Sequence, residues 1–303
     1  MADASKSEER GAKRVREEAT PTERVVKAIE QSERVVFDDA GRLRRFFGDN
    51  TDRCNGLCKF NVPEAPFTAL KLLHEEVVKQ IGEDSMVNWG DGAEDPRKRG
   101  YAYWWPDIPN KLKLAGIQVA QELDDDRTRA AQHEDVMNNC FVKLDLTKAL
   151  NDQFTGALQT LLEIVKQAVP DQYKAFCNFS HLVALQPNLH NEALTLPLHC
   201  DDPLFDGFGI VIVTIAIEGA ATIVLEDEGD AGDPGDAGDP GQDTARWSFE
   251  LNQGDAYVLS GESRNKCAHG VHVSDEKPGR MTLNLRLGLH SRERAHHEIN
   301  KYW

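Results

Sequence analysis

The feature that most constrains the fold is a series of short β-rich segments that fills the chain from about residue 180 to residue 288. Gly, Pro, Asp and Asn separate these segments, and no helical pattern lies between consecutive ones. The segments are SHLVALQ, ALTLPLH, GFGIVIVTIAIEG, ATIVLE, RWSFEL, DAYVLSG and RMTLNLRLG. Short strands without alternating helices are typical of antiparallel sandwiches and barrels. We therefore expect an α+β protein whose core is a double-stranded β-helix, or jelly roll.

Helical periodicity occurs only before these strands, so we expect N-terminal helices packed outside the jelly roll. It is visible in TERVVKAIEQSERVV, in APFTALKLLHEEVVKQIG and in TKALNDQFTGALQTLLEIVKQAV. In the last segment one apolar stripe contains Leu150, Phe154, Leu158, Leu161, Leu162 and Val165. The expected organisation is a disordered tail (1–20), a helical region (21–175), the jelly-roll core (176–292) and a C-terminal tail (293–303).

An acidic repeat explains half of the net charge of −16. Residues 226–243, EDEGDAGDPGDAGDPGQD, hold eight acidic residues and no basic one, and GDAGDP occurs twice. Such a composition cannot bury apolar surface, and we expect a surface insertion between two adjacent strands. The charge of the remaining chain is ordinary for an intracellular enzyme and decides little about partners.

The chain contains no apolar run long enough to span a membrane, and its N-terminus is charged where a secretory signal would be apolar. We expect an intracellular protein of the cytoplasm or nucleus; KRVR at 13–16 is a weak match to a nuclear-import signal. The six cysteines show no regular framework, which favours free thiols. Cys54 and Cys58 could form half of a zinc site, but no second pair follows at a suitable spacing.

The segment LPLHCDD carries His199 and Asp201, which project to the same side of an extended strand. An imidazole and a carboxylate offered together suit a non-haem Fe(II) centre, which needs a second histidine from elsewhere. His-x-Asp alone is a weak signal, since a surface ion pair gives the same pattern. Two histidines, His269 and His272, follow in GESRNKCAHGVHVSD, and their spacing along a strand allows only one of them to point inward.

The strand RMTLNLRLG has a polar residue at every second position: Arg280, Thr282, Asn284 and Arg286. An unpaired buried arginine is costly, so an arginine on the inward face of a strand requires an anionic partner. An iron enzyme that uses 2-oxoglutarate needs a base for the distal carboxylate of this acid. The guanidinium fork matches that carboxylate bidentately.

Together these motifs resemble the AlkB family of 2-oxoglutarate- and Fe(II)-dependent dioxygenases. The resemblance lies in the Gly-Glu-Ser-Arg turn, the His-Gly pair and the Arg-x5-Arg spacing of GESRNKCAHGVHVSD and RMTLNLRLG, and in the His-x-Asp of PLHCDDP. Upstream, SMVNWG at 85–90 and RGYAYWWP at 99–106 resemble the nucleotide-recognition lid of that family. The resemblance covers about residues 85 to 290.

The resemblance implies that His199, Asp201 and His269 bind Fe(II) as the catalytic centre; His269 is preferred to His272 because it stands in the His-Gly position. It further implies that Arg280 binds the distal carboxylate of 2-oxoglutarate and that Arg286 lies at the deep end of the site, near Asp201 and the cofactor or substrate.

One departure concerns the strand before His-x-Asp. The family usually has Asn-x-Tyr there, in contact with 2-oxoglutarate, but the corresponding positions are Val183 and Leu185. Either another residue replaces these contacts or the cofactor binds more weakly.

The resemblance implies oxidative demethylation of N-alkylated bases in single-stranded DNA or RNA. Within DPRKRGYAYWWP, Arg99 could hold a phosphate while Tyr101 and Tyr103 stack on an extruded base. The alternative for this segment is ordinary packing beside a solvated turn. Two other functions stay open: a dioxygenase acting on a protein or a small molecule, and a catalytically weak relative that serves as a binding module.

Overall fold

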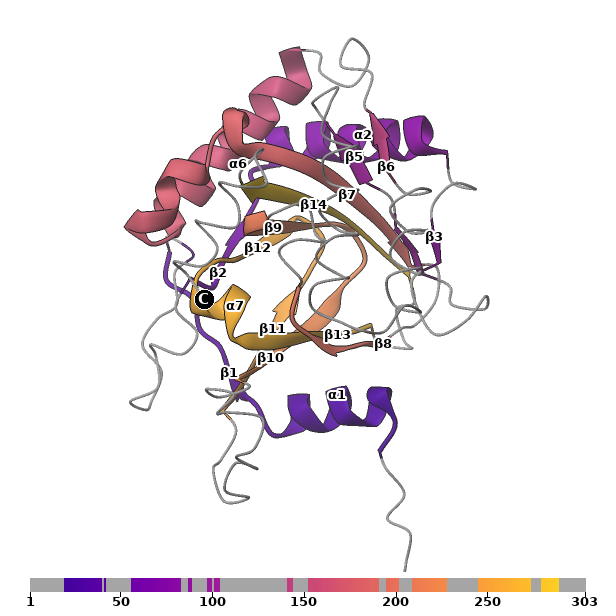
Figure 1. Ribbon diagram of the computed structural model, residues 1–303, viewed down its shortest axis with the longest axis vertical. Coiled ribbons are helices and arrows are strands. Elements are labelled where there is room, and N and C mark those ends of the chain that lie inside the picture. Colours follow the sequence, from indigo (N-terminus) through magenta and orange to yellow (C-terminus); the bar gives the residue numbers. More distant parts are fainter. Residues whose placement is uncertain are drawn as a thin grey trace, which may run out of the picture.

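Two β-sheets face each other, with helices on their outer faces (Figure 1). The computed structural model describes residues 19–39, 41, 56–82, 152–190, 195–201, 209–227, 245–273 and 279–288, together with the backbone of four short strands within 87–143. This arrangement confirms the predicted α+β jelly roll with helices packed outside. No helix of the described residues is long and apolar enough to cross a membrane.

The larger sheet, here the major sheet, has the strand order β2-β12-β9-β14-β7-β4-β3. Beside β7 lies β5, and β5 also pairs with β6. The bounds are β2 (Cys58–Asn61), β3 (Val87–Asn88), β4 (Arg97–Arg99), β5 (Tyr101–Tyr103), β6 (Phe141–Lys143), β7 (Leu182–His190), β9 (Gly209–Glu218), β12 (Asp255–Leu259) and β14 (Arg280–Gly288). β14 is the centre of the sheet and is antiparallel to both neighbours, β9 and β7.

The smaller, minor sheet has the order β1-β11-β10-β13-β8. Its bounds are β1 (Glu33–Arg34), β8 (Thr195–His199), β10 (Ala221–Asp227), β11 (Arg246–Leu251) and β13 (Cys267–His272). β10 and β11 are antiparallel neighbours, as the sequence predicts for the strands on either side of the acidic repeat. Residues 228–244 themselves lie outside the described part of the chain.

Helices α2 (Glu64–Ile81) and α6 (Asp152–Ala168) cover the outer face of the major sheet (Figure 1). The apolar stripe predicted on α6 is buried at Phe154, Leu158, Leu161, Leu162 and Val165, whereas Leu150 lies outside the described residues. These side chains share one core with Leu283 and Leu285 of β14. The outward-facing positions of the central strand are therefore sealed by the two helices.

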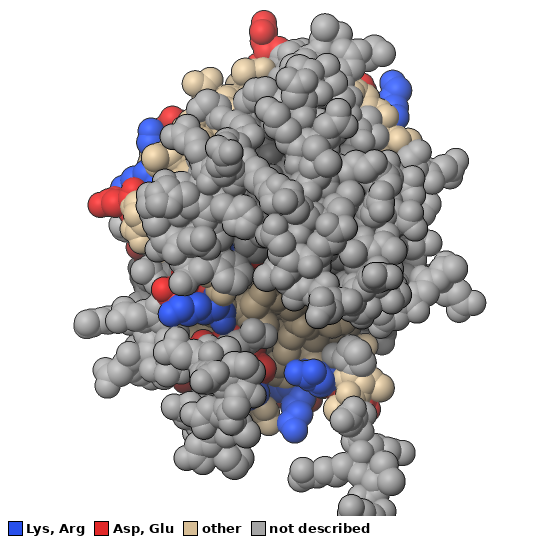
Figure 2. Space-filling model, viewed as in Figure 1, with Lys and Arg blue, Asp and Glu red and all other residues tan. Residues whose placement is uncertain are grey.

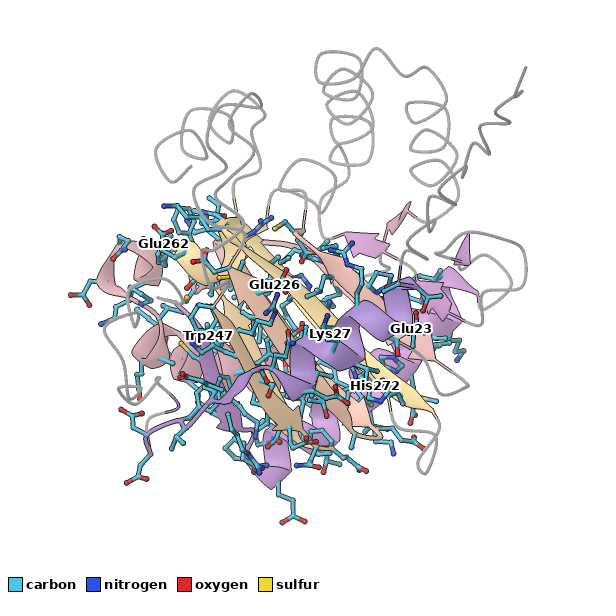
Figure 3. All side chains as sticks on the ribbon, turned by 90° about the horizontal axis from the view of Figure 1, so that it is seen from below. Glu23, Lys27, Glu226, Trp247, Glu262 and His272 are labelled. Carbon is cyan, nitrogen blue, oxygen red and sulfur yellow. The ribbon has the colours of Figure 1, made fainter. Side chains whose placement is uncertain are left out.

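Helix α1 (Pro21–Glu30) lies under the minor sheet (Figures 1 and 3). Thr20 caps its first turn in a capping box with Glu23. The periodicity predicted a helix as far as residue 36, but the chain leaves the helix at Gln31 and forms β1 parallel to β11. The exit buries Val35, whose amide donates to the Ser248 carbonyl at 2.8 Å, so pairing with the sheet outweighs continued helical turns.

The cysteines of the described residues, Cys58, Cys177, Cys200 and Cys267, are free thiols, as the sequence predicts. The Cys58 thiol is buried, with its sulfur 3.2 Å from the Ala168 carbonyl oxygen, while Cys54 lies outside the described residues.

Candidate metal centre

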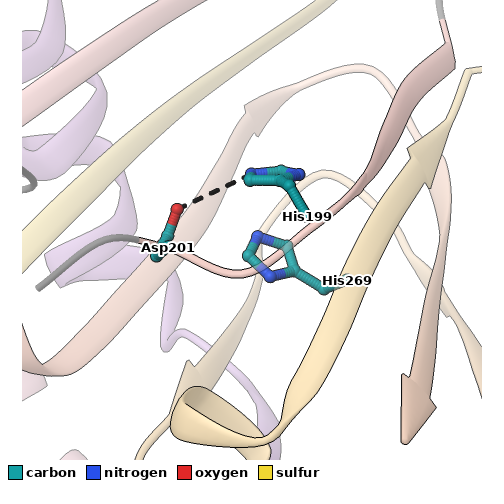
Figure 4. A group of neighbouring side chains, drawn as sticks. All are labelled: His199, Asp201 and His269. Carbon is teal, nitrogen blue, oxygen red and sulfur yellow. Dashed lines mark ion pairs between the residues drawn. The ribbon is translucent and has the colours of Figure 1, made fainter. Parts of the chain in front are cut away.

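Three potential metal ligands meet where β8 and β13 lie side by side in the minor sheet (Figure 4). His199 ends β8, Asp201 follows two residues later, and His269 on β13 is the register partner of His199. Their ligand atoms lie within 4.8 Å of one another. No other group of three such side chains occurs among the described residues. The sequence prediction thus named residues that the fold brings together.

Both histidines are held in the neutral form that can bind a metal. The Nδ1–H of His199 donates to the carbonyl of Pro197 at 2.8 Å, and because a carbonyl only accepts, this leaves the Nε2 lone pair toward the site. Burial, followed by the proximity of His199, lowers the pKa of His269 to about 3. A neutral imidazole is the form that binds a metal.

Asp201 is held as a carboxylate. Burial alone would raise the pKa of Asp201, but Arg286 together with the two histidines keeps that pKa well below its usual value. One oxygen, Oδ2, accepts a hydrogen bond from Arg286 at 2.8 Å. The other, Oδ1, lies 3.6 Å from His199 Nε2 and remains available to a metal. Two imidazoles and one such carboxylate form the donor set typical of non-haem Fe(II) sites with open coordination positions.

His272 is not part of this cluster. It is half-buried and its Nδ1 lies 3.0 Å from the hydroxyl of Thr195 on the neighbouring strand. Figure 3 shows it in the region of α1, on the side of the minor sheet that the helix covers. The preference for His269 as the third ligand agrees with this placement.

The polar face of β14 opens into the same space. Arg280, Thr282, Asn284 and Arg286 line a cavity of about 40 Å³ together with the three candidate ligands. The cavity thus has the ligands of the minor sheet on one side and the arginines of the major sheet on the other.

Arg286 uses its guanidinium group for hydrogen bonds within the protein. It is 1% exposed, and its Nε and Nη2 both donate to Gln186 Oε1, at 3.2 and 2.8 Å, while Nη1 donates to Asp201. Arg286 therefore joins the major sheet to the metal ligand of the minor sheet, as expected for a residue at the deep end of the site.

Arg280 is also buried, at 5% exposure, but no hydrogen-bond partner exists for it among the described residues, and its Nε is sealed from solvent. Burial lowers the pKa of Arg280, partly offset by the neighbouring Tyr257, yet an arginine keeps its proton in proteins. A buried guanidinium of this kind requires an anion, and a carboxylate matches its geometry. The residues present therefore fit both Fe(II) and the dicarboxylate 2-oxoglutarate.

The strand that lacks the expected polar residues at Val183 and Leu185 carries two other polar side chains near the site. Leu185 is fully buried in the core beneath the helices, and the side chain of Val183 lies outside the described residues. The polar residues of β7 that reach the site are Gln186 and Asn188, which hydrogen-bond to Arg286 and to Thr282. Gln186 and Asn188 stand two residues apart on one strand, and this polar alternation is the sequence signal that indicates them. Tyr257 on β12 also lines the cavity and was not predicted, although the hydroxyl of a tyrosine in a buried strand needs a partner, which here is Thr214.

The Gly-Glu-Ser-Arg turn also has a structural role. It forms α7 (Glu262–Asn265), where buried Arg264 donates to the carbonyls of Gly209 and Asp201, each at 2.8 Å. These carbonyls stand at the two ends of the segment that separates the metal ligand from β9. Arg264 thus fixes the backbone that presents the Asp201 carboxylate.

For the predicted substrate-binding residues, the structure gives the backbone but not the side chains. Arg99 on β4 is the register partner of Asn188, and Tyr103 on β5 is that of Ala184. Tyr101 pairs with Phe141 on β6. The strands that carry these residues therefore extend the major sheet beside β7.

No protein-family model matches the sequence, and a search of curated proteins gives no match. Among solved structures, the chain is similar to the non-haem α-ketoglutarate-dependent epimerase SnoN from nogalamycin biosynthesis, with 13% identity, a TM-score of 0.38, and coverage of 80% of this chain and 85% of SnoN. It is similar to OsALKBH1 with 12% identity, a TM-score of 0.41, and coverage of 77% and 97%. It is also similar to AviO1 from Streptomyces viridochromogenes, with 14% identity, a TM-score of 0.35, and coverage of 77% and 90%. Values this low assign neither a family nor a substrate.

Proposed function

We propose that the protein is a 2-oxoglutarate- and Fe(II)-dependent dioxygenase. One observation carries this proposal: a two-histidine, one-carboxylate set and a buried arginine that has no hydrogen-bond partner among the described residues line the same cavity from opposite sheets. The first is a donor set for Fe(II), and the second is a receptor for the distal carboxylate of the oxo acid.

When bound, the iron supplies the oxidation of a substrate C–H bond by O2, coupled to conversion of 2-oxoglutarate into succinate and CO2. The chain's own residues prepare this reaction. His199 and His269 offer neutral nitrogens, and Arg286 occupies one oxygen of Asp201, so that one oxygen remains for the metal. Arg280 orients the oxo acid from the opposite sheet.

We propose N-alkylated bases in single-stranded DNA or RNA as the substrate. Hydroxylation of an N-methyl group gives a product that breaks down to formaldehyde, which removes the methyl group. The support is the position of β4 and β5 beside β7, because register partners project to the same face of a sheet and Asn188 lines the cavity. The two strands that carry Arg99 and Tyr103 thus run beside the strand of Asn188, and a cation and a ring are the residue types that suit an extruded nucleotide.

A protein or small-molecule substrate is the second candidate, which the acidic net charge of −16 allows. On the face drawn in Figure 2, the described lysines and arginines lie in separate groups near acidic residues rather than in a continuous basic surface. The third candidate, a catalytically weak binding module, rested on the lost polar contacts at Val183 and Leu185. Gln186 and Asn188 supply polar groups from the same strand, so the argument for a binding module is weaker.

The test is turnover of 2-oxoglutarate by the purified protein with Fe(II) and ascorbate. We expect succinate to form, and we expect His199→Ala and Asp201→Ala to stop its formation. Formaldehyde release on single-stranded DNA and RNA carrying N-methylated bases then tests the substrate. Succinate without loss of methyl groups from either nucleic acid would leave a dioxygenase and exclude the demethylation proposal. Absence of succinate under all conditions would contradict the enzymatic function itself.

A further inference from the structure

A continuous chain of buried hydrogen bonds joins the two halves of the cavity. Gln186 accepts from Arg286 through Oε1 and donates to Asn188 Oδ1 through Nε2, at 3.0 Å. Asn188 Nδ2 donates to the hydroxyl oxygen of Thr282, also at 3.0 Å. At its far end Arg286 donates to Asp201. The chain therefore runs from a residue beside Arg280 to a candidate metal ligand.

The direction of every hydrogen bond in this chain is fixed by Arg286. An arginine only donates, so Gln186 must turn its oxygen toward the guanidinium and its amide nitrogen toward Asn188. Asn188 must then offer its oxygen to Gln186 and its nitrogen to Thr282. The Thr282 oxygen consequently acts as an acceptor. Its proton has no other acceptor among the described residues and is available in the cavity, two positions along β14 from Arg280.

The side chains of this hydrogen-bond network are also almost inaccessible to solvent. The exposed fractions are 0% for Gln186, 7% for Asn188, 2% for Thr282 and 1% for Arg286. Buried polar groups that lose a partner pay a desolvation penalty that water cannot offset, so the bonds of such a network depend on one another. An acid that orders Thr282 should therefore favour the geometry of Arg286 that holds Asp201.

We propose that Gln186 and Asn188 are positioning residues that couple the two binding events, so that an acid at Arg280 and a metal at Asp201 each tighten the binding of the other. This inference rests on the proposed function, because it takes the two ligands to be a dicarboxylate and a divalent metal. The coupling acts through the protein and adds to any direct contact between the ligands.

The experiment uses Co(II) as the metal and glutarate as the acid, because glutarate lacks the oxo group through which 2-oxoglutarate chelates a metal. Calorimetry gives the Kd of Co(II) without and with saturating glutarate, and their ratio is the coupling factor. For the natural chain we expect a factor of roughly 5 to 150, the usual range for coupled sites.

Two substitutions interrupt different links. Gln186→Glu can still accept from Arg286 but cannot donate to Asn188, so the coupling factor should fall about threefold or more. Asn188→Leu should lower the factor similarly. Ser248→Ala is the control, because it removes a part-buried hydrogen bond from Ser32 outside the cavity and should leave the factor unchanged.

The outcomes separate the two proposals. A natural chain that binds neither Co(II) nor glutarate would overturn the proposed function. A natural chain that binds both with a factor near one would overturn the coupling alone. The coupling is also overturned if Gln186→Glu and Asn188→Leu, shown to be folded by circular dichroism, keep the full factor.

Discussion

The two ends of the cavity face of β14 carry the same side chain in opposite situations. Arg286 and Arg280 lie six residues apart on one strand and are both buried, yet Arg286 makes three hydrogen bonds and Arg280 makes none within the described residues. A buried charge is tolerated only where it is neutralised. The charge of Arg286 is neutralised by Asp201, whereas no anion of the described residues neutralises the charge of Arg280. One end of the strand therefore holds Asp201 in place, and we propose that the other end binds the oxo acid.

The largest expected effect is on catalysis, through Arg280→Ala. Without the guanidinium, the distal carboxylate loses its charged partner, and kcat/KM for 2-oxoglutarate should fall about a thousandfold or more. Succinate formation measures this, and Co(II) binding should persist because the three ligands are untouched. Arg280→Lys serves as the matched control: it keeps the charge without the fork and should recover only part of the loss. Ordinary activity of Arg280→Ala at ordinary cofactor concentrations would show that the assignment is wrong.

The same pair of arginines should differ in their effect on folding. Arg286→Ala leaves the carboxylate of Asp201 and the oxygen of Gln186 buried without their donor, and the free energy of unfolding should fall by about 3 to 5 kcal/mol. Arg280→Ala removes a buried charge that has no partner among the described residues, and should change stability by less than about 1 kcal/mol or raise it. Urea denaturation of the two variants without added ligands measures the difference. Equal losses would mean that Arg280 has a structural partner after all.

The parts of this site that the sequence predicted are those set by local geometry. Alternation along a strand places Arg280 and Arg286 on one face, and it places His199 and Asp201 on one side, whatever the rest of the fold does. The jelly roll itself followed from short strands without intervening helices. These features depend on spacing over a few residues, which a sequence displays directly.

The parts that the sequence did not predict depend on pairings between distant segments. Gln186 meets Arg286 only because β7 and β14 pair in one particular register, and a motif count pointed instead to Leu185, which belongs to the helix-covered core. Arg264 holds the Asp201 backbone across 63 residues of sequence. Helix α1 ended early because Val35 joins the minor sheet. In each case a contact between segments far apart in the sequence determines the structure, and a local sequence pattern does not show such a contact.

His74 on α2 extends the comparison to a buried base that can lose its proton. One ring nitrogen bonds to the backbone carbonyl of Asn188, and Nε2 is sealed without a partner. Burial lowers the pKa of His74 from 6.5 to about 4, so the folded protein holds it neutral at pH 7. A buried arginine keeps its proton and therefore needs an anion, whereas a buried histidine without a counter-charge loses its proton and becomes neutral.

This neutral histidine should make the protein less stable in acid. The unfolded chain binds a proton as the pH falls through 6.5, whereas the folded chain binds it only near pH 4. The free energy of unfolding should therefore decrease across that window, by roughly 2 to 3 kcal/mol from this residue. Urea denaturation between pH 7 and pH 4 measures the slope. His74→Asn keeps an N–H donor without titrating and should flatten it; an unchanged slope would assign the acid sensitivity to other groups.

The smallest expected effect belongs to Tyr257, which lies near Arg280. Burial raises the pKa of Tyr257, and Arg280 offsets this only in part, so its hydroxyl keeps its proton and can donate to an acid held at Arg280. Tyr257→Phe should weaken glutarate binding about tenfold, the share of one hydrogen bond to a charged group, and should lower the free energy of unfolding by about 1 kcal/mol because the hydrogen bond to Thr214 is lost as well. Calorimetry tests this role if Tyr257→Phe is made both in the natural chain and in the Arg280→Ala variant. In the natural chain the loss should be full, and in the Arg280→Ala variant it should vanish, because no acid is then held within reach of the hydroxyl. Equal losses in both backgrounds would instead make Tyr257 a general packing residue of β12, and the receiving end of β14 would then consist of Arg280 and its own strand neighbours alone.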